Sequence, residues 1–130
     1  MALYIPDTHC LIWQATASPR LGTQAAAVLT QVDQGNAHLI IPAIVVAELL
    51  FTIERRKLPI NFNRLFQQWQ ANPAIAIVSL TLDTLLLMRT VTTIPEMHDR
   101  LIACEAYIRK ATLITIDQSI MASGFVPTVW

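Results

Sequence analysis

Short apolar segments alternate with helix-length segments along the whole chain of 130 residues, and this alternation restricts the possible folds. Five segments have the length and the aliphatic composition of strands: residues 2–6, 38–41, 75–80, 113–116 and 126–130. The segments between them are long enough for helices and carry Pro, Gly, Thr or Asn near their expected ends. Strands that alternate with helices in this way predict a three-layer α/β/α sandwich around a mainly parallel sheet, as one domain over residues 1–130.

Local signals indicate where the expected helices begin and end. A first helix is expected to begin around residues 8–13, directly after the first strand. Ser18 followed by Pro19 has the order of an N-cap and a first helical residue, which predicts a second helix from Ser18 to about Asp33. The remaining helices are expected at residues 43–56, from 61 or 63 to 71, from 81 to shortly before 94, at 97–110, and at 118–124. The helix over 43–56 is apolar nearly all round, so we expect it to be buried.

The composition is unusually apolar for a chain of this length. Hydrophobic residues make up 54% and charged residues 14%, against the ~25% charged residues that are usual. This excess predicts a sheet covered on both faces and an additional apolar surface that forms a homodimer. Nine basic residues balance nine acidic ones, which argues against a tight, non-specific nucleic-acid binder.

Cysteine usage and hydropathy indicate a cytoplasmic protein without a membrane span. Cys10 and Cys104 lack the spacing of a metal site and lie in apolar surroundings, so we expect two reduced thiols in the core. The longest uninterrupted apolar run covers residues 39–47, far short of the ~20 residues that a spanning helix needs. The N-terminal residues also lack the pattern of a signal peptide.

Four acidic residues stand in apolar surroundings. Asp7 and Asp117 directly follow expected strands, where open α/β sheets bind their ligands. Glu48 is the only ionisable residue between His38 and Glu54, and burying an unpaired carboxylate costs several kcal/mol. Asp99 lies in the first turn of its helix, on an apolar face. Because strand carboxyl ends and helix amino ends meet at one sheet edge in right-handed βα crossovers, we expect all four side chains in one crevice.

Each acid also has a structural interpretation that the sequence leaves open. Glu48 can reach solvent at a helix edge or pair with an arginine. Asp99 can be an ordinary partner of the helix dipole, and Asp117 can cap the helix that follows it.

Clustered carboxylates repel one another unless a cation joins them. Oxygen ligands without a Cys or His cluster select Mg²⁺ or Mn²⁺, and such sites act on phosphate esters by activating a water and neutralising charge. Without the four acids, the nine basic residues exceed the remaining acidic ones by four, so a metal-loaded chain would present a mildly cationic surface to RNA. The candidate contacts to the RNA backbone are Arg55, Arg56, Lys57 and Arg64.

The motifs around these acids resemble the PIN domain family, and within it the VapC-type toxin ribonucleases of VapBC toxin–antitoxin modules. The similar motifs are DTH at 7–9, Glu48 in its helix, IPEMHDRLIACEA at 94–106, TIDQSI at 115–120 and VPTVW at 126–130. The resemblance spans essentially the whole chain. It implies a small α/β sandwich with Mg²⁺- or Mn²⁺-dependent endoribonuclease activity, a homodimer, and inhibition by a cognate antitoxin protein.

Carried over position by position, the resemblance implies that Asp7, Glu48, Asp99 and Asp117 form the catalytic and metal-binding acidic quartet. Thr115, and with it Thr8, matches a small hydroxyl residue beside these acids. The segment after Asp117 lacks the second acid that many relatives possess, so the number of metal ions stays open. His9 and His98 lie near the quartet, where we expect them to pack or to form hydrogen bonds.

Two other functions compete with a metal-dependent ribonuclease. The chain can be a catalytically silent PIN-like module that binds a protein partner. It can also be a receiver or phosphatase, but the first strand ends in one Asp instead of an acidic pair and no Lys follows the late strands. Metal-dependent cleavage of RNA distinguishes the first function from the other two.

Overall fold

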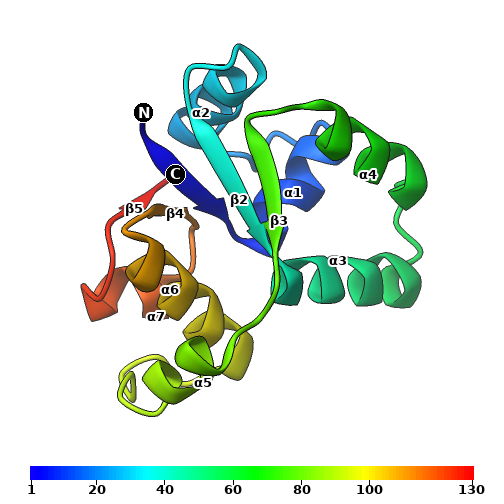
Figure 1. Ribbon diagram of the computed structural model, residues 1–130. Helices are drawn as coiled ribbons and strands as arrows, with labels where there is room; N and C mark the ends of the chain where they lie inside the picture. The colour runs from blue at the N-terminus through cyan, green and yellow to red at the C-terminus, as the bar shows by residue number, and fades with distance from the viewer.

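The computed structural model describes residues 1–130 and contains five parallel strands in one central sheet (Figure 1). The strands are β1 (Leu3–Pro6), β2 (His38–Pro42), β3 (Ile75–Val78), β4 (Thr112–Ile114) and β5 (Thr128–Val129). They lie in the order β3-β2-β1-β4-β5, and each neighbouring pair is parallel. The predicted three-layer α/β/α sandwich is therefore confirmed.

Seven helices form the outer layers of the sandwich. They are α1 (Thr8–Ala15), α2 (Thr23–Asp33), α3 (Ala43–Arg56), α4 (Phe62–Ala71), α5 (Leu82–Met88), α6 (Met97–Arg109) and α7 (Gln118–Ser123). Helices α1, α2 and α4 cover one face of the sheet, and α5, α6 and α7 cover the other (Figure 1). None of the helices combines the length and the apolar character that crossing a lipid bilayer requires.

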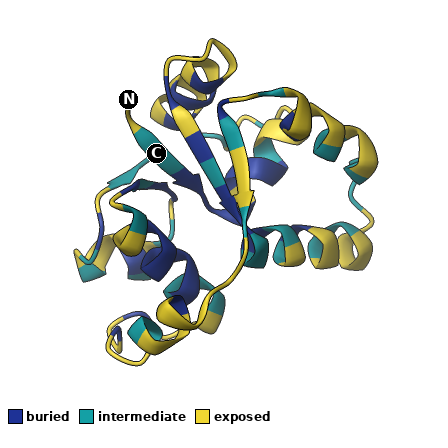
Figure 2. Cartoon of the chain, viewed as in Figure 1, coloured by how far each residue is buried: buried dark blue, intermediate teal, exposed yellow.

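The core lies where β1 and its two neighbours meet helix α6. Ile5 of β1 pairs in register with Leu113 of β4, and both side chains are completely buried. The end of β1 and the central part of α6, residues 101–106, are buried, and the dark blue in Figure 2 is concentrated in the middle of the molecule. Because both faces of the central strands are covered, these strands read as continuous apolar runs in the sequence.

The second helix begins later than the sequence predicts. We expected it to start at Ser18, but α2 starts at Thr23. The Ser18 hydroxyl accepts a hydrogen bond from the backbone N–H of Arg20 (3.2 Å), and the Ser18 carbonyl accepts one from Leu21 (3.3 Å). These bonds close a turn, so the Ser-Pro pair begins this turn and Gly22 is the helix N-cap.

Helix α3 has the predicted bounds but is less buried than predicted. Only Val45 and Leu49 are buried, whereas Phe51 is 63% exposed. Helix α3 contacts β2, α1 and α6 through its first turns and then extends away from the sheet, where its surface is largely yellow and teal in Figure 2. The prediction that this helix is buried nearly all round is wrong, because its second half leaves Leu50 and Phe51 exposed and, of its apolar residues, packs only Ile53 against the core.

Candidate active site

The four acids predicted from the sequence lie around one cleft at the carboxyl edge of the sheet. Asp7 follows β1, Asp117 follows β4, Glu48 is in the second turn of α3, and Asp99 is in the first turn of α6. The cleft has a volume of about 380 Å³. Its lining residues are Asp7, His9, Trp13, Glu48, Glu96, Asp99, Ile116 and Asp117.

A threonine joins the two aspartates that follow the strands. The Thr115 hydroxyl donates to Oδ2 of Asp7 (2.7 Å) and accepts a hydrogen bond from the backbone N–H of Asp117 (3.0 Å). Asp7 is only 6% exposed, and its Oδ1 also accepts from the backbone N–H of Thr8 (2.6 Å). Burial raises the pKa of Asp7, while the hydrogen bond from Thr115 acts in the opposite direction. Thr115 is therefore a positioning residue that lies behind the cleft.

Asp117 has the capping role that the sequence left open. One of its carboxylate oxygens, Oδ1, accepts from the backbone N–H of Ile120 (2.9 Å), which places Asp117 at the N-cap of α7. The same residue lines the acidic cleft. The capping bond uses Oδ1, so it fixes the side chain and leaves Oδ2 without a hydrogen bond inside the protein.

Asp99 is the acid whose ionisation the cleft opposes most clearly. Burial, followed by the negative charges of Asp117, Asp7 and two glutamates, raises the pKa of Asp99 to about 7. The N-cap of α6 is Glu96, whose Oε2 accepts from the backbone N–H of Asp99 (2.8 Å). Because Glu96 makes the capping bond, the Asp99 carboxylate is not needed as a cap and takes part in no hydrogen bond or ion pair.

Glu48 is partly exposed and faces a histidine. Its side chain is 29% exposed, and its Oε2 lies 3.8 Å from Nδ1 of His98. The same His98 nitrogen lies 2.8 Å from Oε1 of Glu96. The hydrogen bond to Glu96 is the main cause that raises the pKa of His98, and the negative charges nearby add to it. Glu48 thus reaches solvent and a histidine, and it has no arginine partner.

Sequence analysis did not identify two side chains of the cleft, Glu96 and Trp13, as site residues. Glu96 adds a fifth carboxylate, and its signal is its position three residues before Asp99, the spacing of an N-cap and the backbone donor it binds. Trp13 lies four residues after His9, so both are on the same side of α1 and both line the cleft. The apolar run around Trp13 concealed this residue among core positions.

The basic residues expected to contact RNA lie away from the cleft. Arg55, Arg56 and Lys57 are exposed at the C-terminal end of α3, and Arg64 is exposed on α4. The helical rise places Arg56 about 12 Å along α3 from Glu48. These basic residues can therefore contact the parts of a long ligand that extend beyond the cleft, but not groups bound inside it.

The donors in the cleft fit a hard divalent cation by their chemistry. The acids around it offer carboxylate oxygens, and the hydroxyl of Thr8 beside Asp7 is buried without a hydrogen-bond partner. No group of three or more acidic, His or Cys side chains is arranged to hold a metal ion. Binding an ion would therefore require the carboxylates that line the cleft to move closer together.

Comparison with known proteins identifies the family. The family model of the PIN domain matches residues 4–122 of the chain. The chain belongs to the PIN domain family. The matched segment includes the four acids and Thr115. No curated protein matches the chain in sequence.

Solved structures share the fold of this PIN domain. VapBC2 from Rickettsia felis, bound to a DNA fragment from its promoter, has a TM-score of 0.71 at 17% identity, covering 98% of this chain and 97% of the other. FitAcB from Neisseria gonorrhoeae has a TM-score of 0.69 at 18% identity, with coverages of 98% and 96%. VapC20 from Mycobacterium tuberculosis, described as a toxin that cleaves the sarcin–ricin loop, has a TM-score of 0.70 at 12% identity, with coverages of 95% and 96%.

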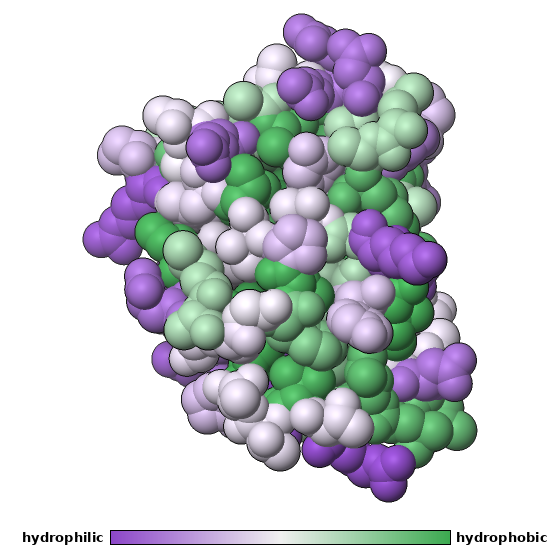
Figure 3. Space-filling view, turned by 90° about the vertical axis from the view of Figure 1, so that its left-hand side faces the viewer, coloured by the Kyte–Doolittle hydropathy of each residue, from purple (hydrophilic) through white to green (hydrophobic).

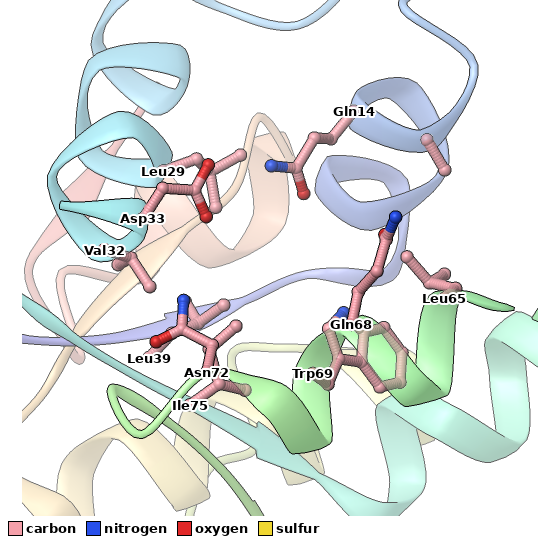
Figure 4. A pocket seen from close by; sticks show the side chains of 11 residues that line it. Gln14, Leu29, Val32, Asp33, Leu39, Leu65, Gln68, Trp69, Asn72 and Ile75 are labelled. Atoms are coloured by element: carbon pink, nitrogen blue, oxygen red, sulfur yellow. The ribbon is translucent and has the colours of Figure 1, made fainter. Parts of the chain in front are cut away.

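The PIN domain has a second hollow, at the C-terminal end of α1, which none of the four acids lines. It has a volume of about 470 Å³ and lies between α1, α2, α4 and strands β2 and β3 (Figure 4). Gln14 and Asp33 extend toward each other across it, above apolar side chains such as Leu39 and Trp69. Asp33 is its only acid, so this hollow does not provide the donors that the acidic cleft provides.

Proposed function

We propose that this PIN domain is an endoribonuclease that requires Mg²⁺ or Mn²⁺ and acts as the toxin of a toxin–antitoxin pair. The observation that carries the proposal is the convergence of four carboxylates on one cleft, where their charges help raise the pKa of Asp99 to about 7. Membership of the PIN domain family supports a nuclease, and the structural likeness to VapC20, described as a toxin that cleaves the sarcin–ricin loop, is consistent with it.

In this proposal, Asp7, Glu48, Asp99 and Asp117 hold the ion. When bound, the ion would activate a water and neutralise charge on the phosphate. Thr115 keeps Asp7 and Asp117 at a fixed spacing through its two hydrogen bonds. Asp99 must lose the proton that its raised pKa retains before its carboxylate can act as a ligand.

Cleavage of a labelled single-stranded RNA tests the activity. The wild-type protein should cut the RNA with Mg²⁺ or Mn²⁺ and not with EDTA. Asp99→Asn should abolish cutting, because an amide is a much weaker ligand for a hard cation. Asp83→Asn is a matched control, since Asp83 is an exposed first-turn acid of α5 outside the cleft. Undiminished cleavage in EDTA, or by the Asp99→Asn protein, would refute the proposal.

We propose further that the protein forms a homodimer in the cytoplasm and binds a cognate antitoxin protein. Large apolar side chains remain exposed, among them Phe51 (63%) and Leu82 (67%), and Figure 3 shows apolar side chains across the middle and lower part of one face. Two free buried thiols, Cys10 and Cys104, are consistent with a reducing compartment. VapBC2 is a complex named for both module components, which supports the antitoxin partner.

Sedimentation tests the homodimer. The wild-type protein should sediment as a dimer at micromolar concentration, and Phe51→Ser should shift the protein toward the monomer. A wild-type monomer would remove the homodimer from the proposal and leave the nuclease untouched.

A further inference from the structure

A row of rings runs from the acidic cleft to the last residue of the chain. The ring of His9 lies 5.3 Å from that of Trp13, and the ring of Trp130 meets Trp13 edge-on at 5.5 Å. His9 and Trp13 line the same cleft as the four acids. The guanidinium carbon of Arg20 lies over the Trp13 ring, 6.0 Å from its centre.

Gly22 holds one end of this row of rings in place. Trp130 packs directly against Gly22, where a Cβ would overlap both the backbone and the ring of Trp130. Gly22 is the N-cap of α2, with an ordinary extended backbone, so it is the close approach of Trp130 that requires a glycine here. The Trp130 ring in turn contacts the Trp13 ring in a T-shaped arrangement and restricts its movement. The Trp13 ring therefore has a set orientation before any ligand arrives, which lowers the entropic cost of binding to it.

Trp13 packs against the core with one part of its ring and lines the acidic cleft with another. Trp13 is only partly buried and His9 is exposed, although the neighbouring residues Cys10, Leu11 and Ile12 are buried. Aromatic side chains beside a site for phosphate present flat faces on which a base of one of the two nucleotides that the phosphate joins can stack. Arg20 adds a positive charge next to the row, suited to the phosphate of the adjoining nucleotide.

We propose that His9 and Trp13 form a stacking platform for a base next to the scissile phosphate, and so determine how the substrate is positioned in the cleft. The inference rests on the proposed nuclease function and names two residues that position its substrate. A paired base is stacked on its neighbours inside a helix and cannot lie on the platform. Because every base has a flat face, the platform should bind a base with little preference for sequence.

Cleavage kinetics with an abasic RNA test the platform. An oligonucleotide with one mapped cut is compared with versions that lack the base on either side of the cut, in turn. For the wild type, loss of the stacked base should lower kcat/KM by about 5- to 150-fold. Trp13→Leu should lower kcat/KM on the intact RNA by a similar factor, with no further loss on the abasic RNA. Trp13→Phe should restore most of the discrimination, because the aromatic face is kept.

The control is Tyr107→Leu, which removes an exposed aromatic ring outside the cleft, one that stacks on Phe125. It should keep the full ratio between intact and abasic RNA. If Trp13→Leu also keeps that ratio, or if the wild type cuts both RNAs equally well, the platform is wrong while the nuclease stands.

Binding without cleavage separates the two proposals. In an Asp99→Asn background with Mg²⁺, adding Trp13→Leu should weaken binding of the labelled single strand by about 5- to 150-fold, measured by fluorescence anisotropy. This difference supports the platform even if no wild-type cleavage is found, in which case only the nuclease fails. Equal binding with and without Trp13→Leu, or tighter binding of a duplex than of the single strand, would overturn the platform.

Discussion

Replacing Asp99 by asparagine should stabilise the protein when no divalent ion is present. Burial and neighbouring carboxylates raise the pKa of Asp99 from 3.8 to about 7. In the unfolded chain the group has its ordinary pKa, so between about pH 4 and 7 the folded state holds a proton that the unfolded state has lost. The stability of the wild type should therefore decline as pH rises through this range. An asparagine cannot ionise and avoids the decline.

The size of the effect follows from the shift. One pKa unit corresponds to about 1.4 kcal/mol, so the full shift sets an upper limit of about 4 kcal/mol. Asp99 is partly exposed, and solvent screening reduces this value. Loss of a first-turn acid also removes about 0.3–1 kcal/mol of favourable interaction with the helix dipole. We expect the variant to gain about 1–2 kcal/mol in unfolding free energy near pH 8 and close to nothing near pH 4.

Urea unfolding in EDTA at these two pH values measures the difference. Asp83→Asn again serves as the control, since it removes a first-turn acid outside the cleft. Mg²⁺ should raise the melting temperature of the wild type by mass action and that of Asp99→Asn much less. If Asp99→Asn is less stable than the wild type near pH 8, or if the difference does not change with pH, the carboxylate stabilises the helix and the repulsion argument is wrong.

Three further predictions follow from buried groups. Thr115→Val should lower the unfolding free energy by about 1–3 kcal/mol, because the buried Asp7 loses a donor, and Thr115→Ser should recover most of it in urea unfolding; equal stability of the valine variant would contradict this. Arg109→Leu should cost about 3 kcal/mol in the same assay, because Glu105 stays buried without its cation, and RNA cleavage should be unchanged. Burial raises the pKa of Cys10 to about 12, so the folded protein should resist iodoacetamide and react only once unfolded, as mass spectrometry would show.

The sequence predicted the parts of the site that depend on local rules. Asp7 and Asp117 follow strands, and parallel strands joined by helices bring their carboxyl ends to one edge, so their shared location needed no further information. The bounds of α3 followed from Pro42 at its start and from the break at Leu58-Pro59 just beyond its end. Thr115 was identified only through the family resemblance. Its hydroxyl bonds to Asp7, 108 positions earlier, and to Asp117, two positions later, and no local sequence pattern indicates a bond to so distant a residue.

What the sequence did not show depends on contacts between distant segments. The start of α2 depends on the turn at Ser18 and on the packing of Gly22 against Trp130, at the other end of the chain. Local N-cap rules favoured Ser18 as the start of the helix. In the structure its hydroxyl and carbonyl groups accept the hydrogen bonds of a turn instead. The exposed second half of α3 also escaped prediction, since an apolar helix reads the same whether its neighbour is the core or another molecule.

The chain contains an internal comparison for its acidic cleft, on the same helix. Glu105 of α6 is 1% exposed, and its carboxylate is satisfied by the hydroxyl of Thr84 (2.8 Å) and by Nε of Arg109 (3.0 Å). Six residues earlier on α6, Asp99 forms no ion pair with a Lys or Arg side chain and has a pKa raised to about 7. Glu105, which joins α5 to α6, thus has an arginine that neutralises its charge. The acids of the cleft have no Lys or Arg partner. An uncompensated cluster of this kind costs stability, and it is the arrangement expected if the missing positive charge comes from outside the chain.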